Sequence, residues 1–183
     1  MAAVDAAIAR GGVDENRLFV TGGSGGGVLT AWIVGTTDRF KAAAVQKPVI
    51  NWASFALTAD QPNFFYKYWF SAPPWEDYEA YWQRSPLSRV GNVKTPTMVV
   101  TGEQDFRTPS PEAEQFYQAL RLRGVDTLLL RVPGASHSLD VRPSQLNARI
   151  AYILAWFAKH DPAASPPATS VVEPSEATAR ASD

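Results

Sequence analysis

A serine lies at the centre of a run of glycines near the start of the chain. Residues 22–26 read GGSGG and match the pattern G-x-S-x-G, with the serine at position 24. In this pattern the serine occupies a sharp turn between a strand and a helix, which exposes its Oγ for nucleophilic attack. The next amide opens the helix and points to where an oxyanion would form. The pattern therefore predicts a nucleophile at Ser24 and an oxyanion donor at Gly25.

Three other kinds of segment compete for this glycine run. A flexible linker is disfavoured, because a strand candidate and an apolar helix candidate flank the run directly. A phosphate-binding loop needs Lys followed by Ser or Thr, where the chain has Val28 and Leu29. A dinucleotide-binding G-x-G-x-x-G that starts at Gly23 needs glycine at position 28, which is also Val28. The nucleophile turn is the reading that the spacing favours.

Serine is a weak nucleophile at neutral pH and needs a base, and that base needs a carboxylate to fix its tautomer. The chain has two histidines: His137 lies in a loop after a strand candidate, and His160 lies at a helix end. Asp105 follows another strand candidate, with Glu103 as its local rival. Each residue alone is a weak signal, since loop histidines and aspartates are common. Their order, Ser24, Asp105, His137, is typical of α/β-hydrolases.

Four short apolar segments are predicted to be the strands that position these residues: 17–21, 42–45, 97–101 and 127–132. Helical patterns separate them, at 2–10, at 28–34 (apolar almost all round, which predicts a buried helix) and after an expected N-cap at Ser110. A final helix has an apolar stripe at Leu146, Ile150, Ile153, Leu154 and Phe157. Strands alternating with helices predict a parallel sheet, with active groups at the carboxyl ends of its strands. The continuous apolar runs suit strands covered on both faces.

Composition excludes several classes of function. The 183 residues are 45% hydrophobic and 19% charged, with a formal net charge of −1, so neither nucleic acid nor an anionic membrane is an expected partner. The absence of cysteine excludes disulfides, Cys-ligated zinc and thiol catalysis, and two histidines are too few for a His-rich metal site. We expect no metal and no cofactor. No apolar run approaches the ~20 residues of a membrane span, and the N-terminus lacks the basic region of a signal peptide.

The C-terminal residues differ in composition from the rest of the chain. Residues 161–183 are rich in Pro, Ala, Ser, Thr and Glu and contain no aromatic residue. Such a segment cannot bury enough apolar surface to offset the entropy of ordering it. We therefore predict one structured unit over residues 1–160 and a disordered tail over residues 161–183.

Several segments together resemble the catalytic domain of the prolyl oligopeptidase family, nearest to its acylaminoacyl-peptidase and dipeptidyl-peptidase-like bacterial enzymes. They are VDENRLFVTGGSGGG (13–27), SPL (85–87), VKTPT (93–97), GEQDFRTP (102–109) and VPGASH (132–137). The resemblance implies that Ser24 is the nucleophile, Asp105 the acid, His137 the base and Gly25 one oxyanion donor. It further implies a serine-type peptidase that cleaves peptide substrates through an acyl-enzyme intermediate. A carboxylesterase and a catalytically silent fragment are the alternatives.

The resemblance also implies a fold class. In that family the hydrolase domain follows a β-propeller domain in the chain and has eight strands. The four strands predicted here match its fifth to eighth strands. We thus expect an α/β-hydrolase fold that is truncated at its N-terminus to the C-terminal half. No His-Gly-Gly-type loop for a second oxyanion donor occurs in these residues. Because the first strand would have a bare apolar edge, the chain is expected to self-associate or to need an upstream polypeptide. The location of the protein is not determined by these residues. The cytoplasm is the default expectation for this chain, and the periplasm is an alternative for a longer protein that contains it.

An aromatic-rich insert lies between the second and third predicted strands. Residues 52–82 hold 12 of the 21 aromatic residues of the chain. Such a concentration indicates either core packing or the wall of an apolar pocket. In the family that the chain resembles, this segment lines the pocket for the residue on the acyl side of the cleaved bond. That resemblance predicts four pocket residues: Phe64, Phe65, Tyr68 and Trp69.

Overall fold

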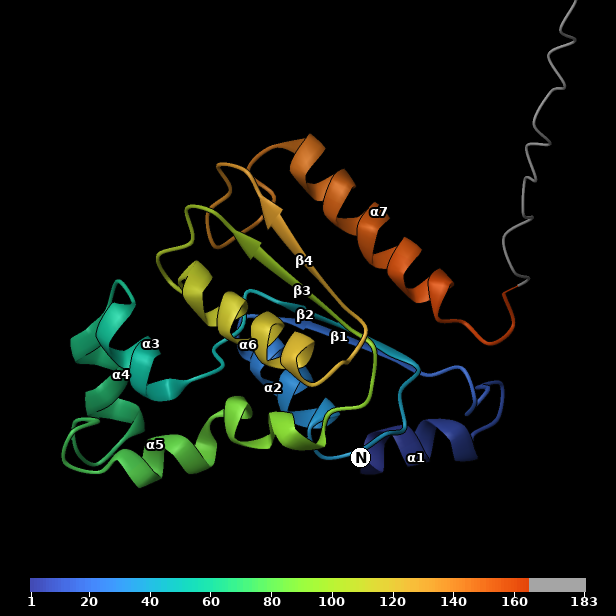
Figure 1. Cartoon of the computed structure of the whole chain (residues 1–183). Coiled ribbons are helices and arrows are strands. Elements are labelled where there is room, and N and C mark those ends of the chain that lie inside the picture. The colour runs from blue at the N-terminus through green and yellow to red at the C-terminus, as the bar shows by residue number, and fades with distance from the viewer. Residues whose placement is uncertain (165–183) are drawn as a thin grey trace, which may run out of the picture.

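Four parallel strands form the sheet of the protein, which is described here from a computed structural model covering residues 1–164. They are β1 (Phe19–Gly23), β2 (Ala42–Gln46), β3 (Thr97–Gly102) and β4 (Thr127–Val132), side by side in chain order (Figure 1). All four predicted strands are confirmed, although β1 begins two residues later than predicted and continues to Gly23. The carboxyl ends of the strands meet at one edge, where the loops after β1, β3 and β4 carry the candidate site residues.

Helices cover both faces of the sheet. The elements α2 (Gly25–Val34) and α6 (Ser110–Leu122) pack on one face, and α7 (Pro143–Lys159) packs on the other (Figure 1). A short helix, α1 (Ala2–Ala9), precedes β1. The segment between β2 and β3 forms α3 (Trp52–Thr58), α4 (Pro62–Trp69), α5 (Tyr78–Arg84) and the 3-10 helix η1 (Pro86–Asn92). In Figure 1, α3, α4 and α5 form a separate group beside the sheet.

The core lies on the two faces of the central strands. Side chains of β2 alternate between the faces: Ala43 and Val45 pack toward α2 and α6, whereas Ala42 and Ala44 pack toward α7. Every residue of β3 is buried. The prediction that these strands are covered on both faces is therefore confirmed for β2 and β3, as is usual for parallel sheets.

Two helices expose more apolar surface than the sequence predicts. Leu29 of α2 is 63% exposed, so this helix is not buried all round. On α7 the predicted stripe is partly wrong, because Ile150 and Leu154 are exposed and Trp156 is the buried large side chain. The face of α7 that packs on the sheet also includes the polar Gln145, whose amide donates to Pro133 O (3.0 Å). A prediction of the packed face from hydropathy alone omits Gln145, because glutamine is polar.

The start of α6 also differs from the prediction. Ser110 is the first helical residue rather than the N-cap, which is Pro109. The Ser110 hydroxyl donates instead to Gly102 O at the end of β3 (3.1 Å). This contact ties the first turn of α6 to the strand that precedes the Asp105 loop.

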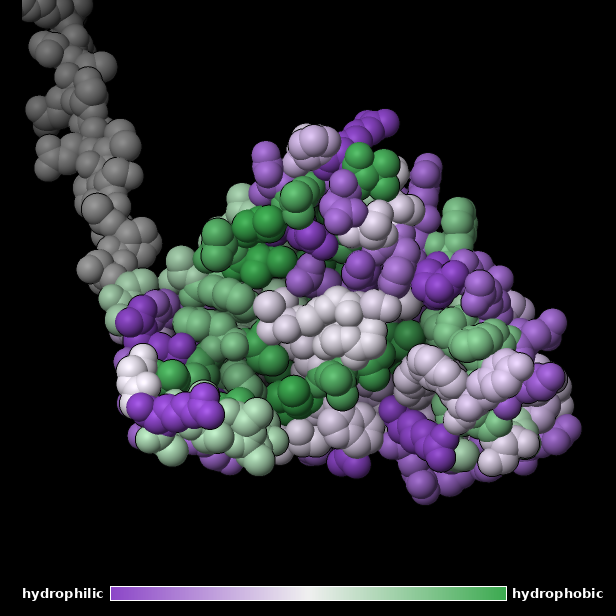
Figure 2. Space-filling view, turned by 180° about the vertical axis from the view of Figure 1, so that it is seen from behind, coloured by the Kyte–Doolittle hydropathy of each residue, from purple (hydrophilic) through white to green (hydrophobic). Residues whose placement is uncertain are grey.

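The sheet has an edge at β1, which pairs only with β2 among the described residues. Figure 2 shows a broad apolar area on the back of the molecule. Self-association or binding of an upstream polypeptide at such a surface stays a prediction. At the C-terminus, residues 161–164 belong to the described part, and Asp161 pairs with Arg17 (2.6 Å). The rest of the predicted tail, residues 165–183, lies outside the described residues, so the predicted boundary at residue 160 stays a prediction. No helix within residues 1–164 is long and apolar enough to cross a membrane.

Candidate active site

Ser24 forms the turn between β1 and α2. The strand ends at Gly23 and the helix begins at Gly25, so the serine is the single residue between them. Its backbone has φ 58° and ψ −121°, a combination that residues other than glycine rarely adopt. The Ser24 amide donates to Gln46 O at the end of β2 (3.1 Å). The sharp strand-to-helix turn predicted from the glycine pattern is thus present.

Glycines allow the strand and the helix to approach closely at this turn. A Cβ at Gly22 would lie 2.3 Å from Gly26 O, and a Cβ at Gly27 would lie 2.3 Å from Gln46 O. Such distances exclude any side chain at either position. Gly26 itself has nothing within 4 Å of an added Cβ, so the second tight position is one residue later than the sequence pattern indicates.

The loops after β1, β3 and β4 bring the three predicted residues together. His137 Nε2 lies 3.0 Å from Ser24 Oγ, and His137 Nδ1 lies 2.9 Å from Asp105 Oδ2. The imidazole is partly exposed, whereas the carboxylate is fully covered. His160 lies at the end of α7, where it contacts the Trp156 ring. Glu103, the rival acid, is exposed and makes no such contact.

Hydrogen bonds hold the Asp105 carboxylate in one orientation. Oδ1 accepts from the amides of Arg107 (3.0 Å) and Thr108 (2.8 Å), and Oδ2 accepts from the Thr108 hydroxyl (2.9 Å). Burial opposes ionisation, but the hydrogen bonds from His137 and Thr108 outweigh it, so the pKa of Asp105 lies below its usual value. The carboxylate is therefore charged at neutral pH and can stabilise an imidazolium. Thr108 was not predicted, although the D-x-x-T spacing is a signal for this kind of turn.

The loops after β3 and β4 are also joined directly through their backbones. The amide of Glu103 donates to Val132 O (3.2 Å), and the amide of Gln104 donates to Ala135 O (2.9 Å). These bonds fix the segment before Asp105 against the segment before His137. The distance between acid and base is thus set by the backbone as well as by the side chains.

A cavity of about 330 Å³ opens beside Ser24. Two of the four predicted pocket residues, Phe65 and Trp69, line it. The other two, Phe64 and Tyr68, do not line it: both are exposed, and their ring centroids lie 5.0 Å apart. The reason is helical periodicity, because positions four apart on α4 share a face and neighbouring positions do not.

Several residues of the cavity wall were missed from the sequence. Trp52 and Phe55 of α3 and Val28 of α2 lie in the wall together with Ser24 and Gly25. Trp52 packs on Trp69 at 5.0 Å between ring centroids. The available signal was the position of α3, which follows the carboxyl end of β2 and thus lies beside the nucleophile turn.

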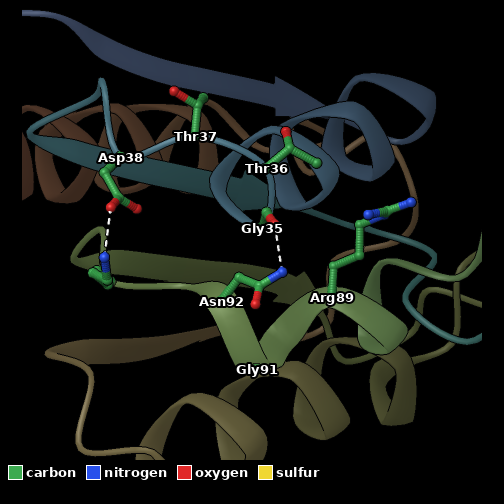
Figure 3. A pocket seen from close by; sticks show the side chains of 8 residues that line it. Gly35, Thr36, Thr37, Asp38, Arg89, Gly91 and Asn92 are labelled. Carbon is green, nitrogen blue, oxygen red and sulfur yellow. Dashed lines mark hydrogen bonds and ion pairs between the residues drawn. The ribbon is translucent and has the colours of Figure 1, made fainter.

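A larger cavity, of about 630 Å³, lies away from Ser24. It is polar and is found where α2 ends and η1 approaches, and an ion pair joins two of its lining residues, Lys94 and Asp38 (2.8 Å, Figure 3). Ser24 is at the other end of α2, about 15 Å away by the helical rise. This cavity therefore forms no part of the candidate active site. Among residues 1–164, no group of His, Asp and Glu side chains is arranged to hold a metal ion.

The arrangement can move a proton from a serine hydroxyl to an imidazole. Ser24 Oγ, His137 and Asp105 form an unbroken hydrogen-bonded chain at the carboxyl edge of a parallel sheet. The amide of Gly25, at the first position of α2, lines the same cavity as the hydroxyl. These are the parts that acyl transfer by an activated serine requires: a nucleophile, a base, an orienting carboxylate and an oxyanion donor.

The parallel sheet, its flanking helices and the turn at Ser24 are those of the α/β-hydrolase fold. The chain belongs to the prolyl oligopeptidase family, whose model matches residues 1–161. It is 46% identical over 163 residues to the uncharacterized peptidase YuxL of Bacillus subtilis (strain 168), covering 87% of this chain and 25% of that protein. It is 39% identical over 166 residues to the acylamino-acid-releasing enzyme of Arabidopsis thaliana, covering 86% of this chain and 22% of that enzyme.

Solved structures agree with this assignment. The Pyrococcus horikoshii acylaminoacyl peptidase matches with a TM-score of 0.81 and 25% identity, over 86% of this chain and 26% of that one. A Mycobacterium tuberculosis puromycin-hydrolyzing peptidase matches with a TM-score of 0.79 and 27% identity, over 88% of this chain and 24% of that one. The chain thus spans about a quarter of the length of these relatives. The recognised family and the predicted fold class are confirmed.

Proposed function

We propose that this chain carries the catalytic residues of a serine-type peptidase that hydrolyses peptide bonds through an acyl-enzyme intermediate. The observation that carries the proposal is the hydrogen-bonded chain from Ser24 Oγ through His137 to the buried Asp105. Membership of the prolyl oligopeptidase family supports it. The proposal assigns the nucleophile to Ser24, the base to His137 and the orienting acid to Asp105.

The reaction follows from these positions. Ser24 Oγ attacks the carbonyl carbon of the peptide, and its proton passes to His137 Nε2. Asp105 stabilises the resulting imidazolium, and the amide of Gly25 donates to the oxyanion. When the C–N bond breaks, His137 gives its proton to the leaving amine. A water molecule then attacks the acyl-enzyme by the same steps and frees Ser24.

The cavity indicates which substrates suit the site. Its wall beside Ser24 is apolar and aromatic, with Trp52, Phe55 and Phe65 among its members. Such a wall favours an apolar side chain on the acyl side of the cleaved bond. Several relatives are named acylamino-acid-releasing enzymes, so we propose peptides with an N-acylated apolar residue as substrates.

Hydrolysis of an N-acetylated phenylalanyl peptide tests the proposal. We expect the chain to release the free amine of the peptide. Ser24→Ala should lower the rate by at least about 10⁴-fold, because a serine nucleophile and its histidine act as a unit. Ser144→Ala is the matched control, since Ser144 is exposed in the first turn of α7 and should leave the rate unchanged.

Two outcomes would contradict the proposal. Cleavage of short acyl esters without any cleavage of peptides would indicate the carboxylesterase alternative. Equal and negligible turnover by the chain and by Ser24→Ala, with both folded, would indicate a catalytically silent module.

A further inference from the structure

Three residues other than glycine have a positive φ within residues 1–164, and each lies in a segment between the carboxyl end of a strand and the next helix. They are Ser24 (58°), Lys47 (39°) and Leu139 (60°). A positive φ is strained for residues other than glycine, and residues with this strain occur most often at functional sites. Ser24 is the proposed nucleophile, and Leu139 lies two residues after His137. Lys47 has no role in the mechanism described above.

The backbone at Lys47 joins three strand ends. Lys47 follows β2 directly, and its amide donates to Val100 O of β3. The carbonyl of the preceding residue, Gln46, accepts from the amide of Ser24 (3.1 Å). The left-handed turn at Lys47 therefore lies between the nucleophile turn and the strand that leads to Asp105.

The Lys47 side chain extends from this turn to the loop that carries the histidine. Its Nζ donates to the backbone carbonyl of His137 (2.7 Å), a residue 90 positions away in the chain. Its stem lies against the nucleophile turn, because a Cβ at Gly23 would be 3.0 Å from Lys47 Cε. One side chain thus contacts both the residue before Ser24 and the backbone of His137.

The Lys47 side chain is half-buried, with its ammonium beside charged groups of both signs. Burial is the main cause that lowers its pKa, and the charge of Arg149 acts in the same direction, whereas Asp105 and Asp140 oppose them. An ammonium is costly to bury unless it is hydrogen-bonded. In the described part of the chain its acceptor is the His137 carbonyl. The hydrogen bond to the His137 carbonyl therefore offsets part of the cost of partly burying the ammonium.

We propose that Lys47 is a positioning residue for His137, which fixes the backbone of the histidine and so the separation of Nε2 from Ser24 Oγ. The inference rests on the proposed function of Ser24 and His137. It assigns no proton transfer to Lys47, which does not touch the reacting atoms. A misplacement of about 1 Å between base and nucleophile lowers the rate of acyl transfer strongly.

Inactivation by a fluorophosphonate tests this role, because the reagent reacts only with an activated serine. The rate constant at saturation, kinact, and the apparent affinity, KI, are measured for the chain and its variants. Lys47→Met removes the donor while retaining most of the stem, and we expect kinact to fall about 10- to 100-fold with KI unchanged. Lys47→Arg keeps a donor and should restore most of the rate. Lys94→Met, which removes an exposed lysine paired with Asp38, is the matched control and should react like the parent chain.

The outcomes separate the inference from the proposed function. If the parent chain is not labelled at all, the proposed function fails, and the inference fails with it. If the parent is labelled and Lys47→Met reacts equally fast, only the inference is wrong. Equal loss of rate in Lys47→Met and Lys47→Arg would also overturn it, because only the packing of lysine would then matter. Thermal unfolding checks each variant, and Lys47→Leu, which also lacks a donor, replaces Lys47→Met with the same expectation if the latter does not fold.

Discussion

The strand-end loops and the aromatic insert of residues 52–82 border the same cavity, but different interactions hold them. In the loops, the carboxylate of Asp105 accepts hydrogen bonds from two backbone amides and a hydroxyl. In the insert, rings pack on rings: Phe55 lies 4.5 Å from Phe65, and Phe70 stacks on Tyr81 at 3.7 Å. Polar contacts thus orient the candidate catalytic groups, and apolar contacts shape the wall beside them.

This difference determines how each region should respond to mutation. Hydrogen bonds are directional and fix both distance and orientation. Aromatic contacts depend mainly on buried area and tolerate a wider range of geometry. We therefore expect the loops to be sensitive to the loss of a charge at constant volume, and the insert to be sensitive to the loss of volume.

The largest expected effect is on reactivity in the loops. Asp105→Asn keeps the shape of the side chain but removes the charge that stabilises an imidazolium. The rate of fluorophosphonate labelling should fall by about 10⁴-fold, which is the typical loss when the carboxylate that orients a catalytic histidine is replaced by an amide. Asp60→Asn is the control: Asp60 pairs with Arg107 near the same cavity, but both are partly exposed, so the rate should change little. Equal rates for Asp105→Asn and the parent would contradict the assigned acid.

The next effect is on stability in the insert. Phe55 is almost fully buried in the aromatic cluster, so Phe55→Ala should lower the free energy of unfolding by about 3–5 kcal/mol. Leu57→Ala on the same helix removes an exposed side chain and should cost less than about 0.5 kcal/mol. Denaturant unfolding measures both. Similar losses at the two positions would mean that the insert is not held by this cluster.

A smaller effect distinguishes the two faces of α4. Phe65 lines the cavity, whereas Tyr68 points outward. Phe65→Ala should weaken KI about tenfold for a fluorophosphonate with an apolar acyl-like group, because a large apolar contact is lost. Tyr68→Ala should leave KI unchanged. If Tyr68→Ala weakened binding as much as Phe65→Ala, the sequence-based pocket assignment would be correct and the structural one wrong.

The smallest effect concerns pH and the link between the insert and α6. Glu112 is buried in α6 and accepts from the amides of Ile50 (2.8 Å) and Asn51 (2.9 Å) at the start of α3. Burial outweighs these bonds and raises its pKa above the usual 4.5. Between pH 4.5 and the raised pKa, the folded state therefore binds more protons than the unfolded state. The contribution of Glu112 to the free energy of unfolding is then lost as the pH rises through this range.

Glu112→Gln isolates this contribution. The variant should lack the loss of stability with rising pH that Glu112 causes, while its amide oxygen still accepts from the two backbone amides. Denaturant unfolding of parent and variant between pH 4.5 and neutrality gives the difference. A difference that grew with the opposite sign, or none at all, would show that Glu112 does not have a raised pKa.

The predictable parts of the molecule are those that local sequence determines. Four apolar runs were sufficient to predict the strands, and parallel order then placed Ser24, Asp105 and His137 at one edge. The sharp turn at Ser24 was predicted as well, because the G-x-S-x-G pattern is typical of a strand-to-helix turn. The three site residues lie at strand ends, which is why spacing and order could identify them before any geometry was known.

The unpredicted parts depend on contacts between distant segments. In α4, aromatic residues occur on every side, so hydropathy cannot tell which face Phe65 shares with the cavity. Gln145 lies on the packed face of α7 because Pro133 O, in another loop, accepts its hydrogen bond. Glu112 becomes buried only when α3 covers it, and the contact of Lys47 joins residues 90 positions apart.

The most direct test of the central claim is to map the site of fluorophosphonate attachment in the native chain by mass spectrometry. The hydrogen-bonded chain through His137 predicts a single adduct, on the peptide that contains Ser24, and its loss when the chain is unfolded before labelling. An adduct on another serine, or no adduct in the folded chain, would contradict the assignment of Ser24 as the nucleophile.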